Sequence, residues 1–453
     1  MSGYSILNLI SGRAGFIMRG GVLLGLILIV AATTNGLLPL IAVDAATPMR
    51  GATPAKGTTR RGDDKRSADK IVGKTSSTRR DPFRKPGLFD DIQKSRRVSF
   101  QSDSLGIEKE RFVEQFGSGI KTVYTIHPEL QRTMKAFFKE NRVPYAVFVA
   151  MNPSNGKILA MVEHSALEPG AKHLALRATY PAASIFKLIT ASAAMEEKGL
   201  TPSTLIVNYD RYDPIQTTLE KAFATSNNEV FGEIALRYLN IGTLVKYASR
   251  FQFNQRIPFE MPVQISRIHV KPQQEDSRKN NHELAKLAAG FGDVGLSPLH
   301  AALIGSAIAN DGRMMTPCLV ERVLGPTGKI LFECEPKVFA QAISSKTAAQ
   351  LRQMMGYTVQ KGTARKAFRS ARRDPSMRLV AVGGKTGSLT GENPRGKVSW
   401  FVGMAPIDHP EIVVSTVVVN HISKRWLVKA SHVAKKGFQT YYRTKSPTRL
   451  AQR

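Results

Sequence analysis

Four serines in the sequence are followed by a lysine three residues later, a spacing that can serve nucleophilic acyl transfer. In a helix, residues i and i+3 lie on one face, so the lysine amine can reach the serine hydroxyl and take its proton. The four pairs are Ser67/Lys70, Ser118/Lys121, Ser154/Lys157 and Ser184/Lys187. Because the spacing occurs in several places, the sequence around each serine has to decide which one is a candidate nucleophile.

Ser184 is the serine whose surroundings could support this chemistry. Ser67 lies in a polar, basic stretch. Ser118 precedes a predicted strand, and Ser154 lies in a predicted turn. Ser184 opens an apolar helix pattern, whose unpaired N–H groups and positive dipole end could stabilise an oxyanion. Burial would lower the pKa of Lys187, as a base requires. A cap serine beside a surface lysine is the alternative interpretation.

Two further motifs follow Ser184 and favour the catalytic interpretation. Ser226-Asn227-Asn228 has the pattern S-x-N, and Lys385-Thr386-Gly387 has the pattern K-T-G, followed by Ser388. Residues 379–382 are apolar and predict a strand that leads into the K-T-G motif. Alone, the first motif could be a turn at a helix cap and the second the end of a strand. The three motifs in this order predict one catalytic site.

The ordered set resembles the signature of penicillin-binding proteins and serine β-lactamases. Further segments are similar to penicillin-binding protein transpeptidase domains, and they lie at residues 125–131, 156–162, 289–312, 362–364 and 400–403. The resemblance covers about residues 120–442. It implies a D,D-transpeptidase that cross-links peptidoglycan by acting on D-Ala-D-Ala stem peptides, and that penicillin acylates. With water as the acceptor, the same site would be a D,D-carboxypeptidase. No cofactor is implied.

The resemblance also implies roles for the motif residues. Ser184, Lys187, Ser226 and Lys385 would be catalytic, while Asn228, Thr386, Gly387 and Ser388 would bind substrate. The backbone N–H groups of Ser184 and Ser388 would form the oxyanion hole. Which residue acts as the base is left open. The chain departs from the family in having Pro181-Ala182-Ala183 before the nucleophile, where Pro-Gly is frequent.

Three other functions compete with this interpretation. A β-lactamase of class A would carry a deacylating glutamate in an E-x-x-L-N loop, and the sequence has no such pattern. A sensor or scaffold that penicillin acylates without turnover would keep the same motifs. A nucleic-acid-binding role rests on the net charge of +30 alone, and we expect no nucleic-acid partner. Protein partners are not predicted.

The order of predicted elements indicates an α+β fold. Strands are expected at 122–125, 145–151 and 157–162, and a helix at about 128–141. A mainly helical stretch from 181 to 312 predicts an all-helical subdomain. Strands at 319–323, 330–334, 379–382, 399–404 and 412–419 precede a final helix at 426–442. We therefore predict one penicillin-binding transpeptidase domain over 120–445, a mainly antiparallel sheet flanked by helices, whose sheet joins both ends of the domain.

The N-terminal region predicts export. Residues 20–43 carry no charge and, as a helix, would span about 36 Å, enough for a bilayer core of about 30 Å. Arg13 and Arg19 precede them, which predicts a cytoplasmic segment 1–19. The apolar stretch is a single-pass anchor in the cytoplasmic membrane or a cleaved signal sequence. Either places the domain outside the cytoplasm, in the periplasm, and cleavage would make the protein secreted.

The segments that flank the predicted domain are polar and basic. Residues 44–119 have no sustained apolar period and predict a flexible basic linker. Residues 446–453 predict a basic tail. The linker is a spacer, or it contacts lipid headgroups or wall polymer.

The chain has two cysteines, Cys318 and Cys334, and no pattern typical of a metal site. The cysteines flank Gly325-Pro326-Thr327-Gly328, a predicted turn that would place them nearly opposite each other in a hairpin. A register error of one residue would put their side chains on opposite faces of the sheet. The sequence therefore allows either a disulfide or two free thiols.

Overall fold

The structure is a computed structural model that describes residues 100, 102–116, 119–208, 215–272, 274–423 and 428–445. The predicted segments 1–19 and 20–43, the predicted tail 446–453 and most of the predicted linker lie outside these residues. Within the described part, no helix is both long and apolar enough to cross a membrane.

A five-stranded antiparallel sheet forms the centre of the fold, in the order β15-β16-β17-β4-β5. Its strands are β15 (Gly383–Glu392), β16 (Arg395–Ala405), β17 (Ile412–Asn420), β4 (Tyr145–Met151) and β5 (Ile158–Ser165). Strand β17 pairs with β4, so segments far apart in the chain meet in one sheet. This confirms the predicted α+β fold, including a sheet that joins the two ends of the domain.

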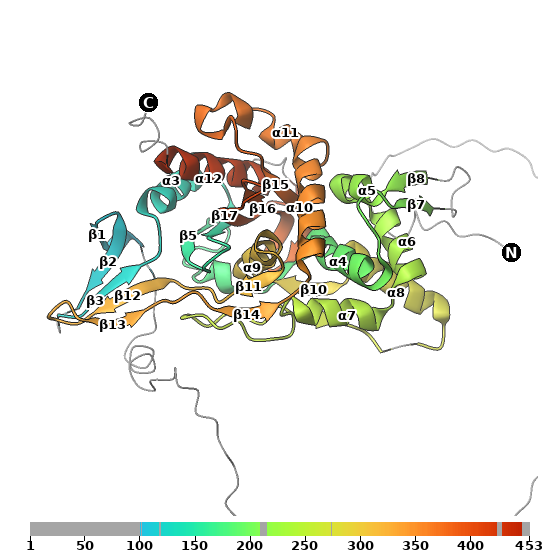
Figure 1. Cartoon of the computed structure of the whole chain (residues 1–453), viewed down its shortest axis with the longest axis horizontal. Coiled ribbons are helices and arrows are strands. Elements are labelled where there is room, and N and C mark those ends of the chain that lie inside the picture. Colours follow the sequence, from blue (N-terminus) through green and yellow to red (C-terminus); the bar gives the residue numbers. More distant parts are fainter. Residues whose placement is uncertain are drawn as a thin grey trace, which may run out of the picture. The chain divides into compact units, whose positions relative to one another are not determined.

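Both faces of this sheet are buried beneath helices. In β17 the side chains of Val413 and Val417 belong to one core cluster and those of Val414 and Val418 to the other, as the alternation along a strand requires. Helices α3 (Pro128–Glu140) and α12 (Ala430–Lys445) cover the second face, and α9 (Pro298–Ala309) covers the first (Figure 1). Ser297 caps α9 and every residue of the helix is buried, so α9 forms the centre of the larger core.

The stretch 181–312, predicted to be all-helical, forms a mainly helical subdomain that is largely green in Figure 1 and also contains short strands. Its helices are α4 (Lys187–Lys198), α5 (Leu219–Thr225), α6 (Asn228–Tyr238), α7 (Ile241–Arg250) and α8 (Ser277–Ala289). Two later helices, α10 (Ser345–Gln360) and the short α11 (Arg365–Phe368), lie outside the predicted stretch. Helix α10 packs against α5 and against strand β15, so this subdomain borders the edge of the central sheet.

A second five-stranded sheet, here called the arm sheet, has the order β1-β2-β3-β12-β13. Its strands are β1 (Gly106–Glu108), β2 (Arg111–Gln115), β3 (Lys121–Tyr124), β12 (Val320–Leu324) and β13 (Ile330–Glu333). Strands β1 and β2 correct the predicted linker, which extended to residue 119. They are short and polar, but Phe112 is fully buried and packs against Phe100, which anchors them to the domain.

Smaller elements complete the fold. Three short sheets contain β6 (Tyr180–Pro181), β10 (Asp293–Leu296) and β9 (Ile268–His269); β7 (Leu205–Asn208) and β8 (Ile215–Thr218); and β11 (Arg313–Met315) and β14 (Val338–Gln341). The 3₁₀ turns are η1 (Ser102–Ser104), η2 (Leu174–Leu176), η3 (Ala183–Ile185), η4 (Ala371–Arg373) and η5 (Pro375–Met377).

The prediction of a strand at residues 379–382 is wrong. Leu379 is 96% exposed, and the strand begins only at Gly383, so the K-T-G motif lies inside β15. This strand is rich in glycine and has low intrinsic strand propensity. It forms because it pairs with β16 along its whole length, from Gly383 opposite Met404 to Glu392 opposite Arg395.

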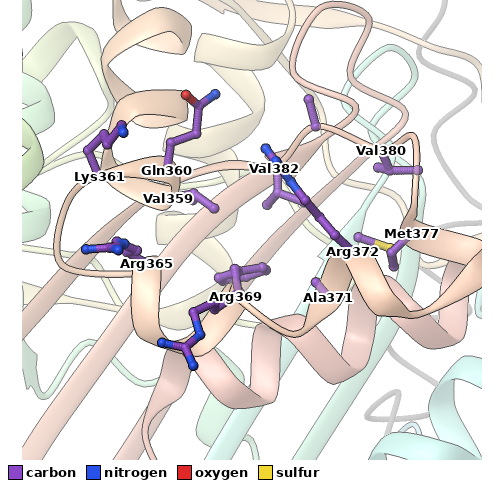
Figure 2. A pocket seen from close by; sticks show the side chains of 12 residues that line it. Val359, Gln360, Lys361, Arg365, Arg369, Ala371, Arg372, Met377, Val380 and Val382 are labelled. Atoms are coloured by element: carbon purple, nitrogen blue, oxygen red, sulfur yellow. The ribbon is translucent and has the colours of Figure 1, made fainter.

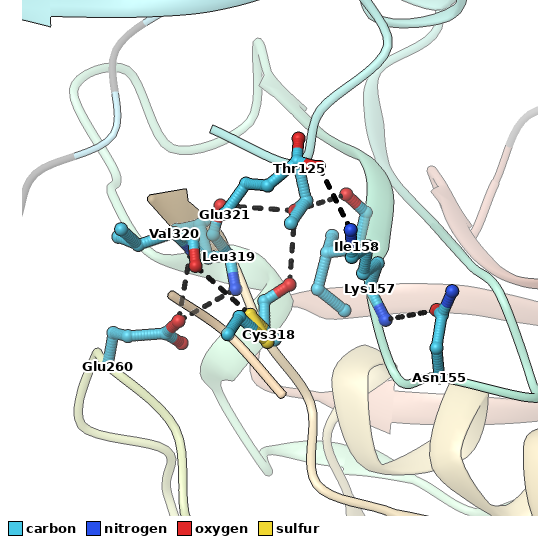
Figure 3. Close-up of a disulfide and its surroundings, with 10 residues drawn as sticks. Thr125, Asn155, Lys157, Ile158, Glu260, Cys318, Leu319, Val320 and Glu321 are labelled. Carbon is cyan, nitrogen blue, oxygen red and sulfur yellow. Dashed lines mark hydrogen bonds and ion pairs between the residues drawn. A yellow bond between two sulfur atoms is a disulfide. The ribbon is translucent and has the colours of Figure 1, made fainter. Parts of the chain in front are cut away.

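Cys318 and Cys334 form a disulfide, with Cα atoms 6.6 Å apart (Figure 3). The hairpin register differs from the predicted one, because a bulge lies between Val323 and Leu324. The backbone at Cys318 is also fixed to the central sheet, since its N–H donates to Gly156 O at 3.0 Å. The bridge therefore lies where the arm sheet joins the rest of the domain.

Candidate active site

Ser184 lies in the 3₁₀ turn η3, directly before α4. The helix predicted to open at Ser184 thus begins with a tighter turn, and Lys187 is the first residue of α4. Two contacts hold the chain that enters the turn. Strand β6 pairs with β10, and the indole N–H of Trp400 donates to Pro181 O at 2.9 Å.

The backbone is strained just before the nucleophile. Ala183 has φ of +48°, a conformation that costs a residue with a side chain about 1–2 kcal/mol. Gly290 lies against this strained residue and has φ of +90°, and a Cβ atom there would lie 2.1 Å from Ala183 O. The turn that presents Ser184 is therefore fixed from outside by a close backbone contact.

Lys187 is fully buried and faces four polar atoms of three residues. Its Nζ lies 2.9 Å from Ser184 Oγ, 2.6 Å from Asn228 Oδ1, 3.3 Å from Ser226 O and 3.5 Å from Ser226 Oγ. The ring of Phe231 lies beneath the amine, at 5.5 Å from its centroid. The first two motifs thus meet at one amine.

Ser226 and Asn228 lie at a junction between two helices. Ser226 ends α5 with φ of +58°, and Asn227 caps α6 by accepting a hydrogen bond from Val230 N. Asn228 is the first residue of α6. This sharp turn explains the S-x-N spacing, because it aims the first and third side chains at Lys187 while the middle one caps the helix.

The K-T-G motif approaches from the edge of the central sheet. Lys385 Nζ donates to Ser226 Oγ at 2.9 Å and to Thr386 O at 2.8 Å. Thr386 Oγ1 lies 2.6 Å from Thr363 Oγ1. Gly387 allows β15 to pass beside the nucleophile turn, since a Cβ atom there would already touch Ile185 N at 3.4 Å. Ser388 follows in β15 with an exposed side chain, and no hydrogen bond joins its hydroxyl to the other motif residues described.

Two buried lysines without a carboxylate partner dominate the electrostatics of the site. Burial, together with the positive charge of Lys385, holds the pKa of Lys187 well below its ordinary value. Burial lowers the pKa of Lys385 to about 7. Within the described residues, neither amine contacts an aspartate or glutamate. The lowered pKa favours the neutral form of the Lys187 amine, which is the form able to accept a proton from Ser184.

The other S-x-x-K pairs are not built in this way. Ser154 is hydrogen-bonded to Asn152 in the loop between β4 and β5, and Lys157 pairs with Glu321 at 2.9 Å. Lys121 pairs with Glu108. Ser67, Lys70 and Ser118 lie outside the described residues.

Residues 146–439 match the family described as the penicillin binding protein transpeptidase domain. The chain belongs to this family. Relatives include the peptidoglycan D,D-transpeptidase PbpA of Mycolicibacterium smegmatis, which is 29% identical over 321 residues, with 60% of this chain and 61% of the relative covered. Stage V sporulation protein D of Bacillus subtilis is 28% identical, with 73% and 55% covered. The chain thus spans less than two thirds of the length of these relatives.

Solved structures of transpeptidase-family proteins share the fold. The D,D-transpeptidase domain of a peptidoglycan glycosyltransferase from Eggerthella lenta is 27% identical, with a TM-score of 0.59, and the match covers 72% of this chain and 84% of that one. Penicillin-binding protein A of Mycobacterium tuberculosis is 24% identical, with a TM-score of 0.58 and 71% and 81% covered. The latter likeness concerns the fold alone.

Some residues that complete this transpeptidase-family site were indicated in the sequence only by their resemblance to the family. Thr363 and Trp400 lie in segments similar to the family, but their hydrogen bonds to the K-T-G threonine and to Pro181 O could not be assigned from spacing. The rings beneath the two amines, Phe231 for Lys187 and Phe223 for Lys385, had no sequence signal beyond their places near Ser226.

Proposed function

We propose that this chain is a serine D,D-transpeptidase of peptidoglycan cross-linking, which forms an acyl-enzyme at Ser184. The observation that carries the proposal is the buried amine of Lys187, 2.9 Å from Ser184 Oγ and with no described carboxylate in contact. Burial favours the neutral amine, which can act as a base, and a serine beside such a base is an activated nucleophile. The family and the name of a relative, peptidoglycan D,D-transpeptidase, support peptidoglycan as the substrate class. The resemblance of the motifs implies stem peptides that end in D-Ala-D-Ala.

In the acylation step, Ser184 Oγ attacks the carbonyl of the penultimate D-alanine while Lys187 Nζ takes the hydroxyl proton. The backbone N–H groups of Ser184 and Ser388 stabilise the oxyanion. The C–N bond then breaks, and the terminal D-alanine leaves with a proton delivered through Ser226. Ser226 suits this role because it lies between the two lysines, 3.5 Å from Lys187 Nζ and 2.9 Å from Lys385 Nζ.

Substrate is held by the groups around this proton path. Asn228 binds the peptide amide, and Thr386 and Ser388 bind the terminal carboxylate, with the positive end of Lys385 nearby. Gly387 keeps the strand close to the nucleophile, so the substrate can lie along the edge of β15 and still reach Ser184. The edge position of β15 in the sheet supports this arrangement, because an edge strand has free backbone groups for an extended peptide.

The acyl-enzyme is released by an amine of a neighbouring stem peptide, which attacks the ester and returns the proton to Ser184. If water attacks instead, the product is the shortened peptide and the enzyme is a carboxypeptidase. β-Lactam antibiotics would acylate Ser184 in the same way, with the lactam C–N bond in place of the peptide bond. A stable adduct distinguishes this enzyme from a β-lactamase, which would hydrolyse it.

We also propose that the domain works outside the cytoplasm, held by an N-terminal membrane anchor or released after signal cleavage. The uncharged stretch 20–43 behind Arg13 and Arg19 supports the proposal. The Cys318–Cys334 disulfide supports it too, since such bonds persist in oxidising compartments.

The reaction can be tested by incubating the purified full chain with a stem pentapeptide, with and without an acceptor amine, and following the products by mass. A cross-linked product that needs the amine supports transpeptidation. Loss of one D-alanine without a cross-link would make the enzyme a carboxypeptidase. No product from either reaction, together with a stable penicillin adduct, would favour a sensor or scaffold.

A further inference from the structure

A pocket of about 410 Å³ lies behind the K-T-G strand and shares no residue with the site described above (Figure 2). Its wall comes from the end of α10, from α11 and η4, and from the segment that leads into β15. Its cationic side chains, here called the pocket cations, are Lys361, Arg365, Arg369 and Arg372. Figure 2 shows the side chain of Arg372 extending across the pocket toward Val382.

The pocket cations are exposed and lack acidic partners. None of the ion pairs within the described residues includes any of them. Asp374 is the one acidic residue between 361 and 378, and it is turned toward α12, where it pairs with Arg443 at 2.6 Å and accepts from Gln439 at 2.9 Å. No carboxylate of the segment is therefore left to neutralise the pocket.

Groups around the pocket add to its positive electrostatic potential. Lys435 of α12 reaches the same segment and donates to Ser370 Oγ at 3.1 Å. Burial, together with the charge of Lys435, lowers the pKa of the neighbouring His432. The floor of the pocket is apolar, with Val359, Met377 and Val382 among its lining residues. An apolar floor lowers the local dielectric and makes each charge more effective toward a ligand.

The kind of anion follows from charge and shape. A guanidinium offers a planar fork of N–H donors that matches phosphate oxygens, while a lysine adds a point charge. One carboxylate would leave most of the positive charge uncompensated. The volume is within the range of small-ligand sites, about 300–1,000 Å³, and exceeds the needs of a single small ion.

We propose that this pocket binds a phosphate-class oxyanion with two or more negative charges, such as a pyrophosphate group. The group is either soluble or part of a phosphorylated lipid headgroup. The pocket also lies close to the catalytic strand. Lys361 is two residues before Thr363, whose hydroxyl contacts Thr386, and Thr363 N donates to Ala224 O at 3.0 Å. A ligand there would rest against the segment that links the S-x-N and K-T-G motifs.

The test compares two triple variants of the full chain that remove the same charge from the same segment. The pocket triple is Arg365→Gln, Arg369→Gln and Arg372→Gln. The control triple is Lys366→Gln, Arg373→Gln and Arg378→Gln, whose exposed side chains do not line the pocket. Binding of inorganic pyrophosphate is measured by calorimetry at fixed ionic strength, with acetate as the monovalent comparison.

We expect saturable binding of pyrophosphate to the wild type, much weaker binding of acetate, and a loss of about tenfold or more in the pocket triple, because each lost charge-assisted hydrogen bond weakens binding. The control triple should change affinity much less. Equal losses in both triples would overturn the proposal, because the attraction would then come from diffuse charge. Absence of saturable binding to the wild type would overturn it as well.

Vesicles of phosphatidylglycerol, with phosphatidylcholine as the neutral comparison, distinguish the two sources of the ligand. Vesicle binding that falls in the pocket triple alone supports a lipid headgroup, and vesicle binding that both triples retain, with pyrophosphate binding lost, supports a soluble phosphate compound. Melting temperature and penicillin acylation check that both triples fold. If the pocket triple does not fold, the single variant Arg372→Gln takes its place, paired with Arg373→Gln.

Discussion

Buried ionisable groups have different partners in the arm sheet and in the active site. In the arm, Glu321 receives hydrogen bonds from Lys157 at 2.9 Å and Arg111 at 3.0 Å. Burial raises the pKa of Glu321, but these hydrogen bonds outweigh that effect and lower it. In the active site, Lys187 and Lys385 are fully buried with hydroxyl, amide and carbonyl oxygens as partners.

This difference separates a region that stabilises the fold, the arm sheet, from a region that carries out chemistry, the active site. Paired charges and a disulfide hold the arm to the domain. Buried amines without a carboxylate partner destabilise the fold, but their shifted pKa values suit them to catalysis. Changes in the site should therefore alter acylation more than stability, and changes in the arm should do the reverse.

The largest effect is expected for Lys187→Ala. Loss of the base should slow acylation of Ser184 by penicillin by about 10²–10⁴-fold. Lys157→Ala is a matched control, because it removes the lysine of another S-x-x-K motif and lies in the arm contact with Glu321. Its acylation rate should equal that of the wild type. Equal rates in Lys187→Ala and wild type would refute the role of Lys187.

The close contact behind the nucleophile turn gives the second prediction. Gly290→Ala should destabilise the protein through backbone strain, about 1–2 kcal/mol, and through the clash with Ala183 O, about 1–3 kcal/mol more, and it should slow acylation. Gly199→Ala is the control, since Gly199 also ends a helix with positive φ but has no atom within 4 Å of the added Cβ. It should lower the melting temperature less and leave acylation unchanged. Identical effects of the two substitutions would contradict the contact.

A change in the arm sheet should lower the stability of the protein and leave acylation unchanged. Replacing Cys318 and Cys334 with serine should destabilise the protein by about 3 kcal/mol at most, because the bridge closes a short loop, with a sequence separation of 16 between the cysteines. Acylation of the folded protein should keep its wild-type rate. Denaturant unfolding and a penicillin-binding assay measure the two quantities. Thiol titration of the unreduced, denatured wild type is the direct check, and two free thiols would exclude the bridge.

The smallest effect concerns the pH profile. Acylation should rise with pH as Lys187 loses its proton, and the positive charge of Lys385 lowers the pKa of Lys187. Lys385→Gln removes that charge, so the Lys187 pKa should rise and the ascending limb should move to higher pH. Arg378→Gln removes an exposed charge and should leave the limb in place. If the ascending limb of the pH profile stays in place or moves to lower pH in Lys385→Gln, the effect of the Lys385 charge on the Lys187 pKa is contradicted. The rate of Lys385→Gln should fall less than that of Lys187→Ala.

Much of this arrangement could be predicted from the sequence, because periodicity and turn residues determine the long elements. The helix expected at 128–141 is α3, and the valine-rich strand at 412–419 is β17. The three motifs also meet as predicted, since Ser226 and Asn228 contact Lys187 and since Lys385 of the K-T-G motif donates to Ser226. The catalytic roles assigned to them stay predictions.

What the sequence missed depends on tertiary contacts. The glycine-rich β15 is a strand only because β16 pairs with it. In the apolar run before it, Leu379 is exposed and residues 380–382 line a pocket instead of pairing with a strand. Strands β1 and β2 were taken for linker because they form through pairing: β1 is exposed and pairs with β2, and β2 pairs with β3 and buries Phe112 against Phe100. The hairpin register was wrong because a bulge cannot be read from turn residues.

The most direct test of the central claim is to label the full chain with penicillin and to locate the adduct by peptide mass mapping. The proposed chemistry predicts one covalent adduct, on Ser184, that persists for many minutes and is absent from Ser184→Ala. Ser154→Ala, which changes another S-x-x-K serine, should label like the wild type. Label on a different residue, or full labelling of Ser184→Ala, would contradict the assignment of the nucleophile, and rapid release of hydrolysed drug would point instead to a β-lactamase.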